Sequence, residues 1–417
     1  MAKSGADLNS KLTKEVEDEP PSSSPVTRHA AEDEEPPSST PLSIKDTFFA
    51  QVPAESWNDW KWQFRNRITT VDELTKYIPL SPREKVRLSM VTERYPLAIT
   101  PYYLSLINLN DPHDPVRKQS VPCFEEIALA DVGFEDPLEE KRDSVVPGLV
   151  HRYPDRVLMV LTDICAMLCR HCTRKREWQN GFWTRTPAEI EAMLDYIRRT
   201  RAVRDIVISG GDPLTLSTGH LESVISQLRA IKHVEIIRIG TRFPVVAPMR
   251  IDEELCNMLS KYGPIWVNTH FNHYQEITPD AAAACDRLLR AGVPVNNQSV
   301  LLRGINDTVK AQLKLCQGLL KIKVRPYYLF QCDEVQGTEH LRTPVQVGVK
   351  IIEKMRGNTS GLAIPSFVID PPGGMGKIPL QHDYVLSQKE DELILKNYQG
   401  KIFSYRNPVL PRPVSAR

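Results

Sequence analysis

Short apolar segments alternate with longer amphipathic segments between residues 150 and 356. The apolar segments have the length and composition of buried strands and cover residues 157–161, 205–209, 234–240, 265–269, 293–301 and 323–330. Strands that alternate with helices predict an α/β fold with a parallel sheet and right-handed crossovers, either an open doubly wound sheet or a barrel-like arc. Six units are too few for a closed eight-fold barrel. In both arrangements the active site lies at the carboxyl ends of the strands.

Threonine followed by proline marks the predicted starts of three helices. Thr186, Pro187 and Glu189 have the pattern of a capping box, in which the threonine hydroxyl and the glutamate carboxylate bind backbone N–H groups of the first turn. The same start is predicted at Thr278-Pro279 and at Thr343-Pro344.

The sequence divides into four regions. Residues 1–45 are rich in proline, serine and acidic side chains, so they predict a disordered tail, and their acid content argues against a mitochondrial transit peptide. Residues 46–150 are predicted to be a helical N-terminal region, residues 151–357 the sheet domain, and residues 358–417 an extended C-terminal strap and tail. In the helical region, large apolar residues at three- and four-residue spacing predict one core-facing helical face: Trp57, Trp60, Phe64, Ile68 and Val71.

Composition limits the class of protein. With 417 residues, of which 41% are apolar, the chain can bury a large core. A formal net charge of +1 gives no support for nucleic-acid binding as the main activity. Eight cysteines are too sparse for a disulfide scaffold, and no apolar run is long enough to span a membrane. These features predict a cytoplasmic protein.

Cys165, Cys169 and Cys172 form a C-x3-C-x2-C array directly after the first predicted strand. Three thiolates can hold three irons of a four-iron, four-sulfur cluster and leave the fourth iron open to a ligand from outside the protein. Two alternatives are a zinc site, with His171 as the fourth ligand, and unligated thiols. A structural zinc site usually draws on a second nearby pair of ligands, and the next cysteine in the sequence, Cys256, stands alone.

A glycine turn follows the second predicted strand at Ser209-Gly210-Gly211-Asp212. Without a Cβ, these glycines let the backbone approach a neighbour closely, so the turn is a candidate for holding the amino group of a ligand on the open iron. An ordinary tight turn explains the same residues.

A second glycine-rich segment ends in Lys377. It is not a P-loop, because Pro371 replaces the first glycine of that motif and Ile378 replaces the hydroxyl residue that would meet magnesium. A lysine flanked by glycines can reach a carbonyl and form a Schiff base, provided that its pKa is lowered by its surroundings. A solvated loop lysine is the alternative.

Together these motifs resemble the lysine 2,3-aminomutase family. The resemblance covers about residues 57–405 and rests on the cysteine array with the basic residues 173–176 after it, on the glycine turn, on the Lys377 segment, and on the stretches 151–156, 268–273, 297–304, 325–328 and 331–333. It implies a partial (β/α)6 barrel of the radical S-adenosylmethionine type with a helical N-terminal region and a C-terminal strap.

The resemblance also implies three cofactors and their sites. Cys165, Cys169 and Cys172 would hold a 4Fe–4S cluster whose open iron binds S-adenosylmethionine, and Lys377 would carry pyridoxal 5′-phosphate. The residues that would bind the pyridoxal phosphate group are Arg152, Tyr153 and Arg156. Those that would line the S-adenosylmethionine side are Ser209, Gly210, Gly211, Asp212, His270 and Gln298.

For the substrate, the resemblance implies that Arg174 grips the carboxylate of lysine and that Asp333 and Asp370 receive its far ammonium. An arginine suits a carboxylate because its planar fork bonds both oxygens. Two acids compensate a buried ammonium, so they point away from glutamate as substrate, whereas arginine stays open as an alternative.

The resemblance further implies an electron donor such as flavodoxin or ferredoxin. Clostridial members extend further at the C-terminus, with a cysteine-rich tail that helps to join subunits through zinc. Here no cysteine follows Cys332, and Thr308 stands where a partner cysteine is expected. A zinc-joined oligomer is therefore not expected, and the possibility of another homo-oligomer is left open.

Overall fold

The computed structural model describes residues 44–179 and 181–409. The prediction of a disordered tail therefore lies almost entirely outside the described residues. None of the described helices is both long and apolar enough to cross a lipid bilayer.

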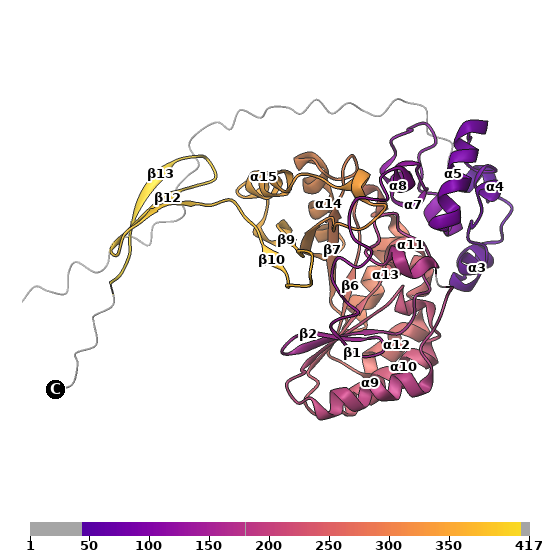
Figure 1. Ribbon diagram of the computed structural model, residues 1–417, viewed down its shortest axis with the longest axis horizontal. Helices are drawn as coiled ribbons and strands as arrows, with labels where there is room; N and C mark the ends of the chain where they lie inside the picture. Colours follow the sequence, from indigo (N-terminus) through magenta and orange to yellow (C-terminus); the bar gives the residue numbers. More distant parts are fainter. Residues whose placement is uncertain (1–43, 180, 410–417) are drawn as a thin grey trace, which may run out of the picture. The chain divides into compact units, whose positions relative to one another are not determined.

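A ten-stranded sheet organises the described part of the chain, and its strands follow one another in sequence order from β1 to β10 (Figure 1). The six predicted strands are confirmed with small shifts at their ends: β3 (Arg156–Val160), β4 (Asp205–Ser209), β5 (Ile236–Gly240), β6 (Ile265–Thr269), β7 (Val295–Leu301) and β8 (Arg325–Gln331). They pair in parallel from β3 to β8. The two outermost strands of the sheet do not pair with each other, so it is an open arc and not a closed barrel.

Helices between the strands cover this arc: α9 (Pro187–Arg199), α10 (Thr218–Ala230), α11 (Phe243–Val246), α12 (Glu253–Lys261), α13 (Pro279–Arg290), α14 (Val309–Lys321) and α15 (Val345–Met355). Helix α9 buries Ile190, Met193, Leu194 and Ile197, whose spacing places them on one face. These side chains belong to the same core cluster as the buried strand residues Ile206 and Ile208 of β4.

Two of the three predicted helix starts are confirmed. Thr186 and Glu189 form a capping box at α9, and the Thr278 hydroxyl accepts a hydrogen bond from the backbone of Ala281 at α13. The start predicted at Thr343 is wrong by one residue. Helix α15 begins after Pro344, which has no side chain that can accept from the first turn.

The N-terminal region is a set of short helices: α1 (Ile44–Phe48), α2 (Ala54–Trp57), α3 (Trp60–Arg65), α4 (Val71–Leu74), α5 (Pro82–Arg94), α6 (Pro101–Leu104), α7 (Pro115–Ser120) and α8 (Glu125–Ala128). The predicted single helical face from Trp57 to Val71 is therefore wrong, although its side chains do pack in the core. Two caps divide it. The Asp59 carboxylate starts α3, and Thr70 starts α4 with a capping box of its own. Strand β1 (Ser144–Val146) and the beginning of β2 (Leu149–Tyr153) also lie in this region and form an antiparallel edge.

The C-terminal region contributes more to the sheet than an extended strap would. Strand β9 (Ser366–Ile369) lies parallel to β8, and β10 (Ile378–Pro379) pairs antiparallel with β9. Phe367 of β9 packs so closely on Gly348 of α15 that a Cβ there would overlap its ring. A separate antiparallel sheet of β11 (Val385–Gln388), β12 (Glu392–Lys396) and β13 (Ile402–Arg406) follows.

Candidate active site

The cysteine array lies on the loop that leaves the carboxyl end of β3, as predicted. A buried ion-pair network fixes this loop: Arg170 and Lys175 pair with Glu126 of α8 at 2.6 and 2.7 Å. Burial alone would raise the pKa of Glu126, but the two cations outweigh it and hold that pKa at about 2. Removing one partner of these pairs would leave an uncompensated buried charge, which strongly destabilises a protein. The pairs therefore hold the cysteine loop against α8.

Two N–H donors face the cysteine sulfurs. The backbone N–H of Arg174 donates to the Cys172 Sγ at 3.3 Å, and the Arg242 Nη1 donates to the Cys169 Sγ at 2.8 Å. Burial first, and then the neighbouring Cys172, raises the pKa of the Cys165 thiol well above its ordinary value. Cationic and amide donors suit sulfurs that carry negative charge, as the ligands of an iron–sulfur cluster do. The donor set therefore fits the predicted cluster.

The zinc alternative differs from the cluster in the number of ligands that one metal ion needs. Within 44–179 and 181–409, no three His, Cys, Asp or Glu side chains form a group that could hold one metal ion. A structural zinc site needs four ligands around a single ion, whereas each cysteine of a cluster binds a different iron. His171, the suggested fourth zinc ligand, has its Nε2 3.2 Å from the amide nitrogen of Asn272.

The glycine turn after β4 lies against the cysteine loop. The backbone N–H of Gly211 donates to the Thr162 carbonyl at 2.5 Å, and that of Asp212 donates to the Ile164 carbonyl at 2.8 Å. A Cβ on Gly210 would overlap the Thr162 carbonyl oxygen, and the φ of Gly210 is +150°. Both glycines are thus required for this close approach.

The other residues predicted on this side take different positions. The Asp212 carboxylate accepts from the Thr241 hydroxyl and from the backbone N–H of Arg242, both at 2.7 Å, and burial raises its pKa to about 6. It therefore ties β4 to the loop after β5. His270 follows β6 and is half-buried; desolvation of its ring, and then the charge of Arg242, lowers its pKa to about 4. Gln298 lies within β7.

A cavity of about 330 Å³ opens beside the cysteine loop. Its lining includes Cys165, Cys172, Arg174, Glu140, Gly210 and Gly211. This volume lies at the lower end of the range for small-molecule sites. The cavity joins the cysteine array, the glycine turn and the arginine that the sequence singled out.

Arg174 is already paired. Its Nε and Nη2 donate to the two carboxylate oxygens of Glu140 at 2.8 and 2.6 Å, and its Nη1 donates to the Gly210 carbonyl at 2.9 Å. Burial alone would raise the pKa of Glu140, but Arg174 and then Arg176 hold it at about 2. Sequence reasoning missed Glu140, because it lies in a loop without periodic pattern or motif.

Lys377 directly precedes β10 and lies against its predicted partners in β2 and β3. The Lys377 backbone N–H donates to the Tyr153 hydroxyl at 3.0 Å, and the Arg156 guanidinium lies over the Tyr153 ring at 3.8 Å. A Cβ on Gly374 would be 3.0 Å from the Arg152 Nη2, so the glycine segment lies directly on Arg152. An amine, a phenol and two guanidinium groups thus form a donor set that fits a phosphorylated aldehyde.

The two predicted acids also lie beside Lys377. The Lys377 Nζ is 2.9 Å from the Asp370 Oδ2, while the buried Oδ1 of Asp370 lacks a hydrogen-bond partner among the described residues. Burial first, and then the charge of Asp370, raises the pKa of Asp333 to about 7. Asp370 therefore pairs with an ammonium in this structure, that of Lys377, and the charge of the same ammonium acts on Asp333.

The comparisons with known proteins agree with this geometry. A family model described as the Radical SAM superfamily matches residues 159–314, and one described as Lysine-2,3-aminomutase matches residues 352–414. The L-lysine 2,3-aminomutase of Clostridium subterminale is 54% identical over 87% of this chain and 87% of its own, and that of Acetoanaerobium sticklandii is 53% identical over 88% and 89%. The glutamate 2,3-aminomutase of Clostridioides difficile is 45% identical over 84% and 82%.

The open parallel sheet with its cysteine loop is that of a radical S-adenosylmethionine enzyme. Within this class, the chain belongs to the lysine 2,3-aminomutase family.

Proposed function

We propose that this protein interconverts L-lysine and β-lysine by moving the α-amino group to C3. The observation that carries the proposal is a site with opposite charges at its two ends. At one end Asp370 pairs with Lys377, and both charges act on Asp333; at the other end Arg174 lines the cavity beside the cysteine loop. Glu140 is near both ends, because it pairs with Arg174 and its charge also acts on Asp333. Such a site suits an amino acid with a carboxylate at one end and an ammonium at the other.

The acids favour lysine over glutamate. A buried ammonium would cost several kcal/mol to desolvate without an anionic partner, and the pair Asp333 and Asp370 supplies one. The side-chain carboxylate of glutamate would instead meet two like charges in a buried site. Arginine carries a cation in a similar place, so its use is tested alongside that of lysine.

Each group has a defined part in this proposal. When bound, the 4Fe–4S cluster, S-adenosylmethionine and pyridoxal 5′-phosphate supply the radical chemistry and the electron-accepting ring. Cys165, Cys169 and Cys172 hold the cluster, and Lys377 anchors the pyridoxal group. Arg174 orients the substrate carboxylate and the two acids fix its far ammonium, so that C3 is held in one position. We further propose flavodoxin or ferredoxin as the electron donor.

The test is a substrate panel with the anaerobically reconstituted enzyme. Lysine, arginine and glutamate are each incubated with S-adenosylmethionine and a chemical reductant, and the β-amino acid is measured by mass spectrometry. We expect β-lysine from lysine and at least a hundredfold less product from glutamate. Turnover of arginine above that of lysine, or no β-lysine from a preparation with full iron and cofactor content, would overturn the proposal.

Variants of the acids sharpen this test. Asp333→Asn and Asp370→Asn should each raise the KM for lysine at least tenfold, because each removes one charge that faces the ammonium. Asp391→Asn, an exposed acid in the same C-terminal region, is the matched control and should leave the KM unchanged. Unchanged KM values in both site variants would remove the argument from the acids.

A further inference from the structure

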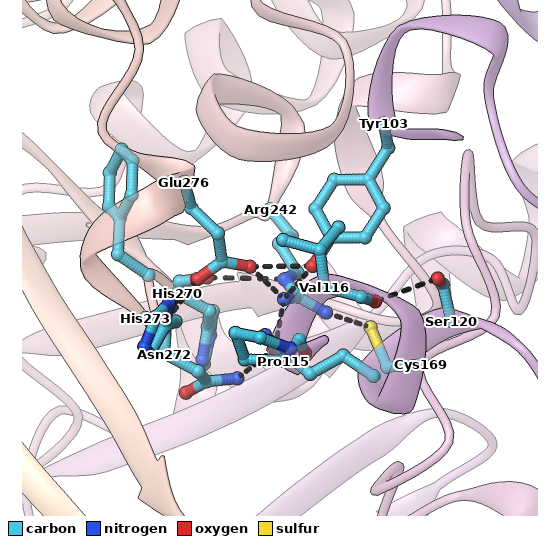
Figure 2. Close-up of polar contacts among 12 residues, drawn as sticks. Tyr103, Pro115, Val116, Ser120, Cys169, Arg242, His270, Asn272, His273 and Glu276 are labelled. Carbon is cyan, nitrogen blue, oxygen red and sulfur yellow. Dashed lines mark hydrogen bonds and ion pairs between the residues drawn. The ribbon is translucent and has the colours of Figure 1, made fainter. Parts of the chain in front are cut away.

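A buried arginine donates a hydrogen bond to one of the cysteine sulfurs. Arg242 follows β5 and precedes α11, and its Nη1 lies 2.8 Å from the Cys169 Sγ (Figure 2). Neither the spacing of the cysteines nor any motif in the sequence singles out this residue.

The rest of the guanidinium is held by other partners. Its Nη2 donates to the carboxylate of Glu276 at 2.7 Å, to the amide oxygen of Gln119 at 2.6 Å and to the Tyr103 hydroxyl at 3.2 Å. Its Nε donates to the His270 carbonyl at 3.1 Å. Nε and Nη2 therefore hold the guanidinium group in place, and Nη1 is the atom that donates to the sulfur.

Glu276 compensates the charge of Arg242. It is fully buried, and it accepts from the Tyr103 hydroxyl at 2.6 Å and from the backbone N–H groups of Asn272 and His273 at 2.6 and 2.7 Å (Figure 2). The pair thus places a cation at the sulfur and an anion behind it. In a buried site both charges act strongly on a nearby redox centre, because water screens them little.

We propose that Arg242 is a positioning residue that sets the reduction potential of the cluster, and that Glu276 moderates its effect. Reduction adds one negative charge to the cluster. An N–H donor on a ligand sulfur stabilises that charge, and hydrogen bonds to the sulfurs are among the known determinants of cluster potentials. The inference rests on the proposed cluster at Cys165, Cys169 and Cys172.

The test is a redox titration of the reconstituted holoenzyme followed by electron paramagnetic resonance. Arg242→Gln removes the cationic donor, so the ratio of reduced to oxidised cluster at a fixed potential should fall at least tenfold, a shift of about 59 mV to more negative values for one electron. Glu276→Gln keeps the shape but leaves the arginine charge uncompensated, so its potential should shift to more positive values. Arg242→Lys keeps the charge and should lie between wild type and Arg242→Gln.

The opposite signs separate this role from simple damage to the fold. Arg250→Gln alters another buried arginine, which donates to the carbonyls of Leu214 and Leu216 and to no cysteine sulfur, so it should shift the potential much less than Arg242→Gln does. If Arg242→Gln does not retain iron, the reduction potentials of Arg242→Lys and Glu276→Gln test the inference instead. Potentials equal to wild type in all variants that retain the cluster would overturn this inference alone, whereas a wild-type protein that forms no cluster would overturn the proposed function.

Discussion

At the scale of single residues, the proposed function makes the charge state of Asp333 decide when the site can receive the substrate ammonium. Its pKa of about 7 lies above the ordinary range of an aspartate, because the half-buried carboxyl group is desolvated and Asp370 is close. Below this pKa the carboxyl group is neutral and cannot pair with the substrate. Attachment of Lys377 to a cofactor would remove a nearby cation and so raise the pKa of Asp333 as well.

The first prediction is therefore a pH dependence. The kcat/KM for lysine reports groups of the free enzyme, so it should fall as the pH drops below about 7, by roughly tenfold per unit at the lower end. In Asp333→Asn this limb should disappear at a lower overall value. A wild-type profile that is flat between pH 6 and 8 contradicts the assignment.

The second prediction concerns Lys377. Borohydride treatment of the enzyme loaded with pyridoxal 5′-phosphate should add the cofactor mass to the peptide that contains residue 377, and Lys377→Ala should lose the label. Lys389→Ala removes an exposed lysine of the same region and should keep it. Peptide mass spectrometry measures both. A label that persists in Lys377→Ala would show another anchor.

Not every residue of the site could be predicted from the sequence. The cysteines have a recognisable spacing, because one loop must present several ligands to a cluster. Lys377 is recognisable from the glycines that precede it. Glu140 and Arg242 act through partners far away in the sequence, Arg174 and Cys169, and such pairings exist only once the sheet has formed. Because Arg174 pairs with Glu140, the proposed binding of a substrate carboxylate would use the remaining N–H groups of Arg174 or displace Glu140.

At the scale of elements, hydrogen bonds join the glycine turn after β4 to the start of the cysteine loop after β3. Strands and helix starts with local signals were predictable, as the capping box at Thr186 illustrates. The caps at Asp59 and Thr70 interrupt an apolar pattern that looks continuous. Strand β9 was missed because it is short and gains its place by packing Phe367 on Gly348.

The third prediction tests this contact. Gly210→Ala places a Cβ on the Thr162 carbonyl, so the cysteine loop must move, and the iron content after anaerobic reconstitution should fall by at least half. Gly219→Ala is the matched control, because a Cβ there meets no atom within 4 Å and alanine favours the helix. Equal iron content in the two variants would show that the turn tolerates a side chain.

At the scale of the whole molecule, the open sheet brings two kinds of chemistry to one site. The cysteine loop follows β3, the first parallel strand of the arc, and Lys377 follows β9, the last. Arg174 of the cysteine loop pairs with Glu140, and Asp370 directly after β9 pairs with Lys377. Under the proposed function, this arrangement would let motifs that are dispersed in the sequence hold one amino acid between the cluster and the pyridoxal group.

The most direct test of the central claim follows the migrating nitrogen. Lysine labelled with nitrogen-15 at the α-amino group is converted by the reconstituted enzyme in unlabelled ammonium buffer, and the product is examined by nuclear magnetic resonance. The account predicts β-lysine with the label bonded to C3 and no loss to the buffer. Label that stays on C2 or exchanges with the buffer would contradict it.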